Sequence, residues 1–314
     1  MENFIFSVNC TLPIFAVMVI GIIGRRLGLL NDEYVAKANK FNFYTAMPAM
    51  LFMNMYGQDI RGSFNAHTFI IVGSCIIAMF VLAMLAARFL VKDKYMRGAF
   101  AQGAFRGNTA LVGISLIMNM YGESVIAAGV VACVVPLYNI GAVIFLSVFA
   151  AKGETKRKSV GSVIKSIITN PLIIGTVLGT IAALTGLKLP TAAERTLGYM
   201  SDMAMGTALI CIGAGMRFSA LRRCLKPALL ATVFKLVIFP LLFVPVAYHA
   251  GYRMDALMAI FIAVGSPAAV NSYTMAQSMN HDADLASGIV VISTLLGSVT
   301  MTLWVFVLRN MGLV

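Results

Sequence analysis

Two six-residue stretches decide how this chain folds: Gly107-Asn108-Thr109-Ala110-Leu111-Val112 and Gly265-Ser266-Pro267-Ala268-Ala269-Val270. Each lies inside a long apolar segment. Pro267 lacks an N–H group and disfavours helical geometry at Ser266, whereas Gly107 and Gly265 give the backbone extra freedom. Because the stretches lie 158 residues apart, we expect a matching pair of broken helices, one in each half of the chain. Simple kinks, which are common in membrane helices, are the alternative.

The same 158-residue offset relates other parts of the two halves. Between positions 12 and 62 it gives ten identities, which include Pro13 with Pro171 and Gly28-Leu29 with Gly186-Leu187. Apolar composition inflates such matches, but the two unusual stretches coincide at the same offset. The sequence therefore predicts an internal duplication.

The composition indicates a membrane protein. Of the 314 residues, 60% are hydrophobic and 11% are charged, against roughly 25% charged residues in a soluble domain. These values disfavour a nucleic-acid-binding protein, a soluble enzyme and a disordered chain. A membrane span takes roughly 20 mostly apolar residues. We expect ten transmembrane helices at the stretches that lack Asp, Glu, Lys and Arg: 3–24, 41–58, 62–87, 107–122, 124–151, 166–187, 203–216, 236–252, 256–280 and 285–308.

The distribution of positive charge predicts the orientation. With ten spans, the odd-numbered loops carry 17 Lys and Arg, whereas the even-numbered loops and the termini carry 5. Positive loops stay in the cytoplasm, so in a plasma or inner membrane both termini should lie outside and the loop 152–165 should be cytoplasmic. Five spans per half is an odd number, so the second half enters the membrane upside down. Such inverted repeats are typical of secondary transporters, whose substrates bind near the midplane.

Candidate substrate-binding residues cluster at the predicted breaks. Unwound backbone at membrane depth must be buried or line a watered cavity, and half-helix N-termini favour anions. Arg106 has the planar fork that binds a carboxylate; snorkelling or pairing with an acid is the alternative. Asn139 and Asn271 suit either a cavity or helix packing. The predicted substrate site comprises Arg106, Gly107, Asn108, Thr109, Asn139, Ser266, Pro267 and Asn271.

Two further charges lie inside or beside predicted spans. We expect Lys235 to snorkel to the membrane interface, in preference to a role in coupling or charge balance. Asp202 is a candidate for carrying a coupling proton or balancing a cation, but we favour a structural residue at a helix end. The five cysteines and three histidines lack metal-ligand spacing, so we expect no metal and no cofactor.

The chain resembles the auxin efflux carrier family in its short prokaryotic form, over nearly its whole length. The similar motifs are, in order, Leu12-Pro13-Ile14-Phe15, Phe43-Tyr44-Thr45-Ala46-Met47-Pro48-Ala49-Met50-Leu51-Phe52, Phe105-Arg106-Gly107-Asn108-Thr109, Val135-Pro136-Leu137-Tyr138-Asn139, Asn170-Pro171-Leu172 and Ser266-Pro267-Ala268-Ala269-Val270-Asn271-Ser272-Tyr273. Each motif is weak alone, but their order and spacing are specific. The chain departs from many relatives at Ile114-Ser115 and at Gly206, where they have proline.

The resemblance implies an all-α polytopic membrane protein of two inverted five-helix repeats. In that fold, which bile acid:sodium symporters share, helices 4 and 9 are broken and cross. The resemblance further implies a scaffold at 1–58 and 166–218, which should form a homodimer, and a transport unit at 59–151 and 219–314. The linker 152–165 joins the two halves.

The first functional hypothesis is an alternating-access transporter that exports a small organic anion, such as a carboxylate, across the lipid bilayer. The family resemblance implies auxin-like acids or dicarboxylates. A sodium- or proton-coupled symporter is the alternative. An intramembrane enzyme or receptor is disfavoured, because we find no nucleophile–base pair and a receptor has no need of an inverted repeat. We expect no nucleic-acid partner.

Overall fold

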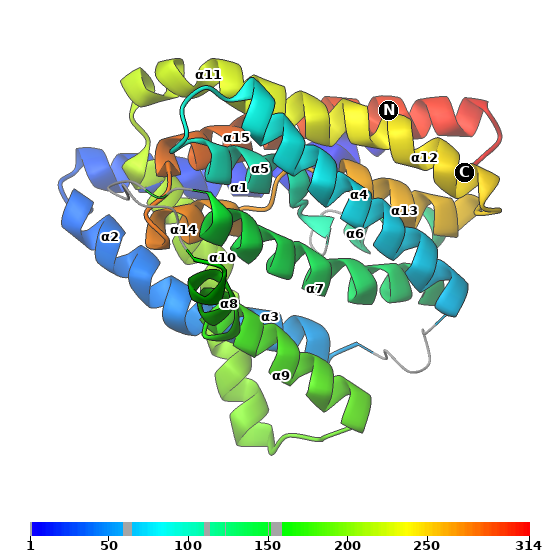
Figure 1. Cartoon of the computed structure of the whole chain (residues 1–314), viewed down its shortest axis with the longest axis horizontal. Coiled ribbons are helices and arrows are strands. Elements are labelled where there is room, and N and C mark those ends of the chain that lie inside the picture. Colours follow the sequence, from blue (N-terminus) through cyan, green and yellow to red (C-terminus); the bar gives the residue numbers. More distant parts are fainter. Residues whose placement is uncertain (1, 59–64, 110–113, 123, 150, 152–158) are drawn as a thin grey trace.

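The computed structural model describes residues 2–58, 65–109, 114–122, 124–149, 151 and 159–314, and most of them are helical (Figure 1). The predicted all-α class is confirmed. The helices are α1 (Glu2–Arg26), α2 (Asp32–Phe41), α3 (Met47–Tyr56), α4 (Ala66–Leu90), α5 (Arg97–Phe105), α6 (Ile114–Tyr121), α7 (Val125–Val148), α8 (Val160–Ile168), α9 (Pro171–Thr185), α10 (Thr191–Gly215), α11 (Phe218–Val233), α12 (Phe239–His249), α13 (Met254–Gly265), α14 (Asn271–Ser278) and α15 (Ala283–Asn310). Most of the predicted linker, residues 152–158, lies outside the described residues.

Several helices are long and apolar enough to cross a membrane. In the described part of the chain they number five: α4, α7, α10, the continuous helix Arg222–His249 and α15. The pair α8 and α9, bent by 53°, makes a sixth if it counts as one span. Large apolar side chains such as Ile70, Leu178 and Leu303 are exposed on the outer surface. These features support a polytopic membrane protein, and length and composition alone identify fewer than the ten predicted spans.

Short polar side chains begin several helices. Asn65, Ser124, Asn170 and Asp282 each accept a hydrogen bond from a backbone N–H two or three residues further on. This contact satisfies a donor that the first helical turn leaves free. At the other end of α9, Gly186 has a φ of 70°, a left-handed conformation that glycine adopts readily. Local sequence therefore accounts for many helix boundaries.

A π-helical segment, η3 (Phe234–Ile238), joins α11 to α12. It precedes Pro240, which has no N–H to donate and whose ring crowds the preceding turn. The N–H of Phe239 bonds to the carbonyl of Phe234, five residues back, and this wider turn lets the helix continue past the proline. A similar segment, η1 (Asn42–Ala46), precedes Pro48.

The helix bounds recur along the chain. In the first half, α2 begins at Asp32 and α7 begins at Val125. In the second half, α10 begins at Thr191 and α15 begins at Ala283. The interval from α2 to α10 and the interval from α7 to α15 both match, almost residue for residue, the offset that relates the two halves of the sequence.

Helices α5 and α13 lie deepest in the protein. Every residue from Gly98 to Phe105 and from Ala256 to Gly265 is buried. Among the helix pairs in contact, α4 packs on α5 and α7, α11 packs on α15, α3 packs on α9, and α1 packs on α10. A helix covered on all sides belongs to the core, so the two helices that precede the predicted breaks occupy the centre of the molecule.

Candidate functional site

Both predicted helix breaks are present. α5 ends at Phe105 and α13 ends at Gly265. The next residue of each, Arg106 and Ser266, has extended backbone, with ψ angles of 115° and 151°. The first break therefore forms without a proline. Residues 110–113, which complete the first stretch and its flank, lie outside the described residues.

The two breaks lie against each other. Gly107 and Ala268 form an isolated antiparallel β-bridge. Beside it, the N–H of Asn108 donates to the carbonyl of Pro267 at 2.8 Å. Backbone groups that the breaks release from the helices thus bond to one another, as burial away from water requires.

Gly107 is required by the close approach of two side chains. A Cβ atom at this position would overlap with Ser266 Oγ and would lie 2.9 Å from Lys235 Nζ. No larger residue fits unless its neighbours move. Gly107 therefore contributes to the first break in two ways. It frees the backbone, and it leaves room for the side chains of Ser266 and Lys235.

A cavity of about 210 Å³ lies beside the first break. Six of the predicted substrate-binding residues line it: Arg106, Gly107, Asn108, Thr109, Asn139 and Asn271. The rest of the wall consists of Met50, Leu51, Asn54, Val135, Tyr138, Met205, Ala269 and Val270. Pockets for drug-sized ligands measure roughly 300–1,000 Å³, so this cavity suits a smaller molecule.

Ser266 and Pro267, the other two predicted residues, lie behind the cavity wall. Ser266 is fully buried, and its hydroxyl lies 3.5 Å from the hydroxyl of Thr109. Pro267 packs against Gly297, where a Cβ atom would overlap with the proline ring. Their contacts hold the second break in place, and neither residue lines the cavity.

Arg106 is 5% exposed and lines the cavity. Its Nη1 lies 2.7 Å from Sδ of Met275. Among the described residues, no Asp or Glu forms an ion pair with it. The guanidinium carries five N–H donors in a planar fork. Arg106 therefore neither snorkels to solvent nor pairs with a described acid.

Asn139 and Asn271 contribute polar groups that lack good partners. The side-chain carbonyl oxygen of each is buried and accepts no hydrogen bond from the described residues. Within the described part of the chain, their amide nitrogens make only long contacts, 3.5 Å to Thr176 Oγ1 and 3.6 Å to Met50 Sδ. An unsatisfied buried polar group costs roughly 1–3 kcal/mol, so a ligand that bonded to these amides would recover that energy.

Lys235 does not snorkel, which corrects the expectation from the sequence. Its side chain is fully buried. The Nζ atom shares its three N–H groups among one hydroxyl and three backbone carbonyls, at 3.0 to 3.3 Å: Tyr138 Oη, Phe105 O, Val264 O and Ala263 O. None of these contacts leads to the membrane interface.

The burial of Lys235 follows from the helix bounds in the structure, which the predicted span 236–252 did not anticipate. Lys235 lies near the middle of the continuous helix Arg222–His249. At roughly 1.5 Å per residue, the start of that helix is roughly 20 Å away, beyond the reach of a lysine side chain. Tyr138, which occurs in a quoted motif but was not among the predicted site residues, is its hydroxyl partner.

Asp202 lies halfway along α10 and is exposed. The expectation that it lies at a helix end is therefore wrong. It also does not belong to the described wall of the cavity. The reason is that α10 begins at Thr191, well before the charge-free stretch that suggested a helix end near this residue.

A set of polar contacts joins α2 to α14. Asn39 is buried, and its Nδ2 donates to Gln277 Oε1 at 2.6 Å. Thr274 Oγ1 donates to Asn39 Oδ1 at 3.0 Å. Nothing in the sequence pattern singled out these residues, which come from opposite ends of the chain.

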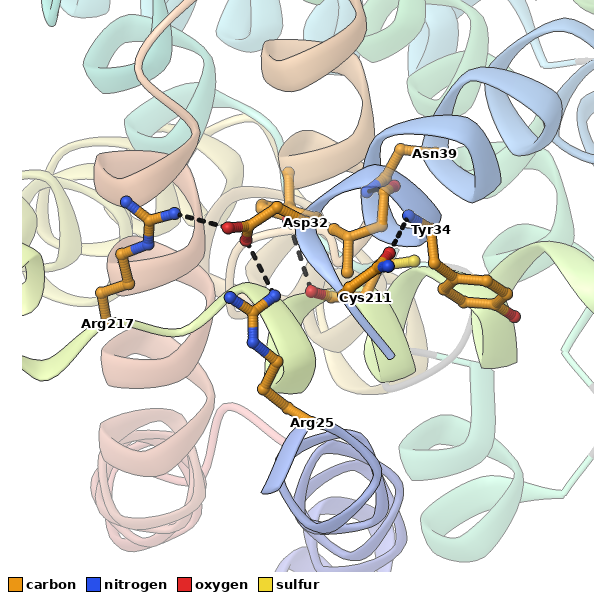
Figure 2. A network of polar contacts seen from close by, with 9 residues as sticks. Arg25, Asp32, Tyr34, Asn39, Cys211 and Arg217 are labelled. Carbon is orange, nitrogen blue, oxygen red and sulfur yellow. Dashed lines mark hydrogen bonds and ion pairs between the residues drawn. The ribbon is translucent and has the colours of Figure 1, made fainter. Parts of the chain in front are cut away.

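Next to this contact, Asp32 joins two arginines (Figure 2). Its carboxylate accepts from Arg25 at 2.8 Å and from Arg217 at 3.1 Å. The hydrogen bond from Arg25, together with the charges of Arg25 and Arg217, holds the pKa of Asp32 below its ordinary value. The network ties the end of α1 and the start of α2 to the start of α11, which Arg217 precedes.

Comparison with known proteins identifies the family. A family profile described as "Membrane transport protein" matches residues 6–305. An uncharacterised transporter of Methanothermobacter thermautotrophicus is 25% identical over 310 residues, which cover 97% of this chain and 99% of the relative. A Rhizobium meliloti protein named "Putative malonate transporter" is 26% identical over 310 residues, 95% of each chain. The uncharacterised transporter YfdV of Escherichia coli K12 is 23% identical over 311 residues, 97% of this chain and 98% of the relative. The chain belongs to this membrane transport protein family, the auxin efflux carrier-like transporters that the sequence motifs resemble.

Proposed function

We propose that the protein is an alternating-access transporter that exports a small organic anion, in particular a carboxylate. The observation that carries the proposal is Arg106. Its guanidinium is buried in the wall of a small cavity, and no described acid pairs with it. A buried charge is costly without a partner. A substrate carboxylate would supply that partner, because it accepts two charge-assisted hydrogen bonds from a guanidinium.

The charge around the cavity supports an anion. The described wall contains no Asp or Glu. A second buried cation, Lys235, contacts Tyr138 of that wall. Two buried positive charges repel a cationic substrate and attract an anionic one. The Rhizobium relative named for malonate fits a small dicarboxylate.

For the architecture we propose two inverted five-helix repeats with crossing broken helices. The recurring helix bounds and the contact between the two breaks support this arrangement. Residues 1–58 and 166–218 form the scaffold, and residues 59–151 and 219–314 form the unit that moves. On this division the contact of Asn39 with Gln277 joins scaffold to moving unit, and its rupture would open that end of the protein. Exposed apolar side chains of the scaffold helix α9 offer a surface for a homodimer.

For the orientation and energetics we propose external termini and a cytoplasmic loop 152–165. An inside-negative membrane potential then favours export of an anion by ~2.3 kcal/mol per charge per 100 mV. A sodium- or proton-coupled symporter is the second candidate, and removal of sodium and collapse of the pH gradient distinguish the two.

Purified protein in proteoliposomes tests the function. Vesicles loaded with malonate, malate or indole-3-acetate should exchange labelled anion at a rate well above that of protein-free vesicles. Transport of none of a broad carboxylate panel, together with movement of a cation, would contradict the proposal. Arg195→Ala, on the exposed face of α10, is a matched control that removes an arginine charge away from the cavity.

A further inference from the structure

The ammonium group of Lys235 lies between the C-terminal ends of two half-helices. It donates to the carbonyl of Phe105, the last residue of α5, and to the carbonyls of Ala263 and Val264, in the last turn of α13. A helix C-terminus presents carbonyls without helical partners and a partial charge of roughly −0.5. Two such ends repel each other unless a cation lies between them.

The second break removes the usual donors to these carbonyls. In an uninterrupted helix the carbonyl of Ala263 accepts from the residue four positions on, which is Pro267 and has no N–H. The carbonyl of Val264 would accept from Ala268, whose N–H donates instead to Ser293 Oγ at 3.1 Å. The lysine ammonium, together with the hydroxyl of Tyr138, therefore supplies the donors that the end of α13 lacks.

The surroundings of Lys235 resemble the oxygen shell of a bound cation. Tyr138 Oη accepts from Nζ and in turn donates to the carbonyl of Ala263. Gly107 leaves the space that the ammonium occupies. Among the described residues, no Asp or Glu forms an ion pair with Lys235. The positive charge therefore faces one hydroxyl and the carbonyls of two helix ends, and none of the described carboxylates.

We propose that Lys235 is a tethered cation, which holds the place of a free monovalent cation where the two half-helices meet. This proposal rests on the anion transport proposed above. Because the chain fills the site itself, transport requires no sodium. Substitution by alanine removes Cγ, Cδ, Cε and Nζ, a fragment the size of n-propylammonium, and so creates a site for that ion.

The first arm of the test measures wild-type counterflow of labelled malonate in sodium medium and in N-methyl-D-glucamine medium of equal ionic strength. The two rates should agree within about twofold. A strict requirement for sodium would overturn the proposal, because it would show that a free cation still has to bind.

The second arm compares Lys235→Ala with Lys235→Met. Both should lose at least tenfold in counterflow. Addition of n-propylammonium chloride should restore Lys235→Ala several-fold, whereas tetramethylammonium, which has no N–H donor, should not. Lys235→Met should not respond, because the methionine side chain fills the space. Full activity of Lys235→Ala without amine, or equal rescue of both variants, contradicts the proposal. Lys226→Ala, an exposed lysine on the same continuous helix, controls for loss of a positive charge.

A third arm reads the site without transport. The melting temperature of purified Lys235→Ala should rise saturably with n-propylammonium, and that of the wild type should not. If the wild type transports no anion, the proposed function fails. The shift in the melting temperature of Lys235→Ala still shows whether the site binds a cation. If the wild type transports anions but Lys235→Ala shows neither shift nor rescue, only the tethered cation fails. Should Lys235→Ala fold poorly, n-propylammonium during growth should raise the monodisperse yield, and an unchanged yield counts against the proposal.

Discussion

The two helix breaks occupy corresponding places in the two halves but contribute different things. The first places Arg106, Gly107 and Asn108 in the cavity wall. The second places Ala269, Val270 and Asn271 in the wall and keeps Ser266 and Pro267 behind it, where they bond to other buried groups. Of the two breaks, the first thus supplies the charged side chain of the wall, whereas the second supplies Asn271, two apolar side chains and the structural contacts of Ser266 and Pro267. If the two halves arose by duplication, as we propose, one copy can retain the geometry while the other acquires the chemistry.

Closing the space at the first break should have the largest effect. Gly107→Ala puts a Cβ atom into Ser266 and next to the ammonium of Lys235. We expect loss of counterflow and a reduced monodisperse yield in detergent, since overpacking costs typically about 1–3 kcal/mol and the two side chains that would have to move are fully buried. Gly206→Ala is the matched control, because a Cβ atom there meets nothing within 4 Å. Wild-type behaviour of Gly107→Ala would show that the two breaks tolerate separation.

Removing the charge at the first break should have the next largest effect. A charge-assisted hydrogen bond contributes roughly 1.5–3 kcal/mol, so Arg106→Ala should weaken carboxylate binding roughly 10- to 100-fold. The carboxylate affinity of Arg106→Lys should lie between those of the wild type and Arg106→Ala, because a lysine keeps the charge but lacks the planar fork. Thermal-shift titration with malonate measures the affinities, with Arg195→Ala as control. Unchanged affinity would reassign Arg106 to structure and remove the difference between the breaks.

Removal of a neutral polar side chain should have a smaller effect on affinity, and the effect should depend on whether the side chain lines the cavity or lies behind its wall. Asn271→Ala removes an amide that lines the cavity, and a neutral hydrogen bond contributes roughly 0.5–1.5 kcal/mol, about 2- to 10-fold in affinity. Ser266→Ala, behind the wall, should leave affinity within about twofold and act on melting temperature instead. The same titration measures both variants, and equal losses of affinity would contradict the division of roles.

The surface network of Figure 2 should have the smallest effect. The pKa of Asp32 lies below its ordinary value of 3.8, mainly because Arg25 donates a hydrogen bond to the carboxylate. A carboxyl whose pKa is lower in the folded state adds stability above its ordinary pKa and loses it as the pH falls through the folded value. The side chain is 62% exposed, so the gain is small. Between about pH 5 and about pH 3, the wild-type melting temperature should fall slightly more than that of Asp32→Asn; parallel falls would count against this contribution.

Much of the fold was predictable because its signals are local. Pro267 and Gly107 disturb helical geometry through their own backbone, so the breaks next to them follow from the sequence. Helix ends were predicted less well, because charge-free stretches and helices are different things. α10 begins at Thr191 and contains Asp202, since an exposed charge does not interrupt the backbone hydrogen bonds of a helix.

The site was predictable only where its residues belong to the breaks or to family motifs. Arg106 and Asn139 were found in this way. The direction of Lys235 was not, because it depends on the space beside Gly107 and on carbonyls that Pro267 leaves without donors. The contact of Asn39 with α14 was missed for a similar reason, as its partners are distant in sequence and no local pattern marks them.

The main-chain contact between the breaks has a consequence for biogenesis. The carbonyl of Arg106 accepts from the N–H of Ala269, which the ribosome adds about half a chain length later. At roughly 5–20 residues per second this delay lasts roughly 8–30 s. During it, the backbone after α5 lacks this partner in a medium that supplies no water. The centre of the transporter is thus completed late, and a nascent chain arrested before Ala269 should be a target for membrane quality control.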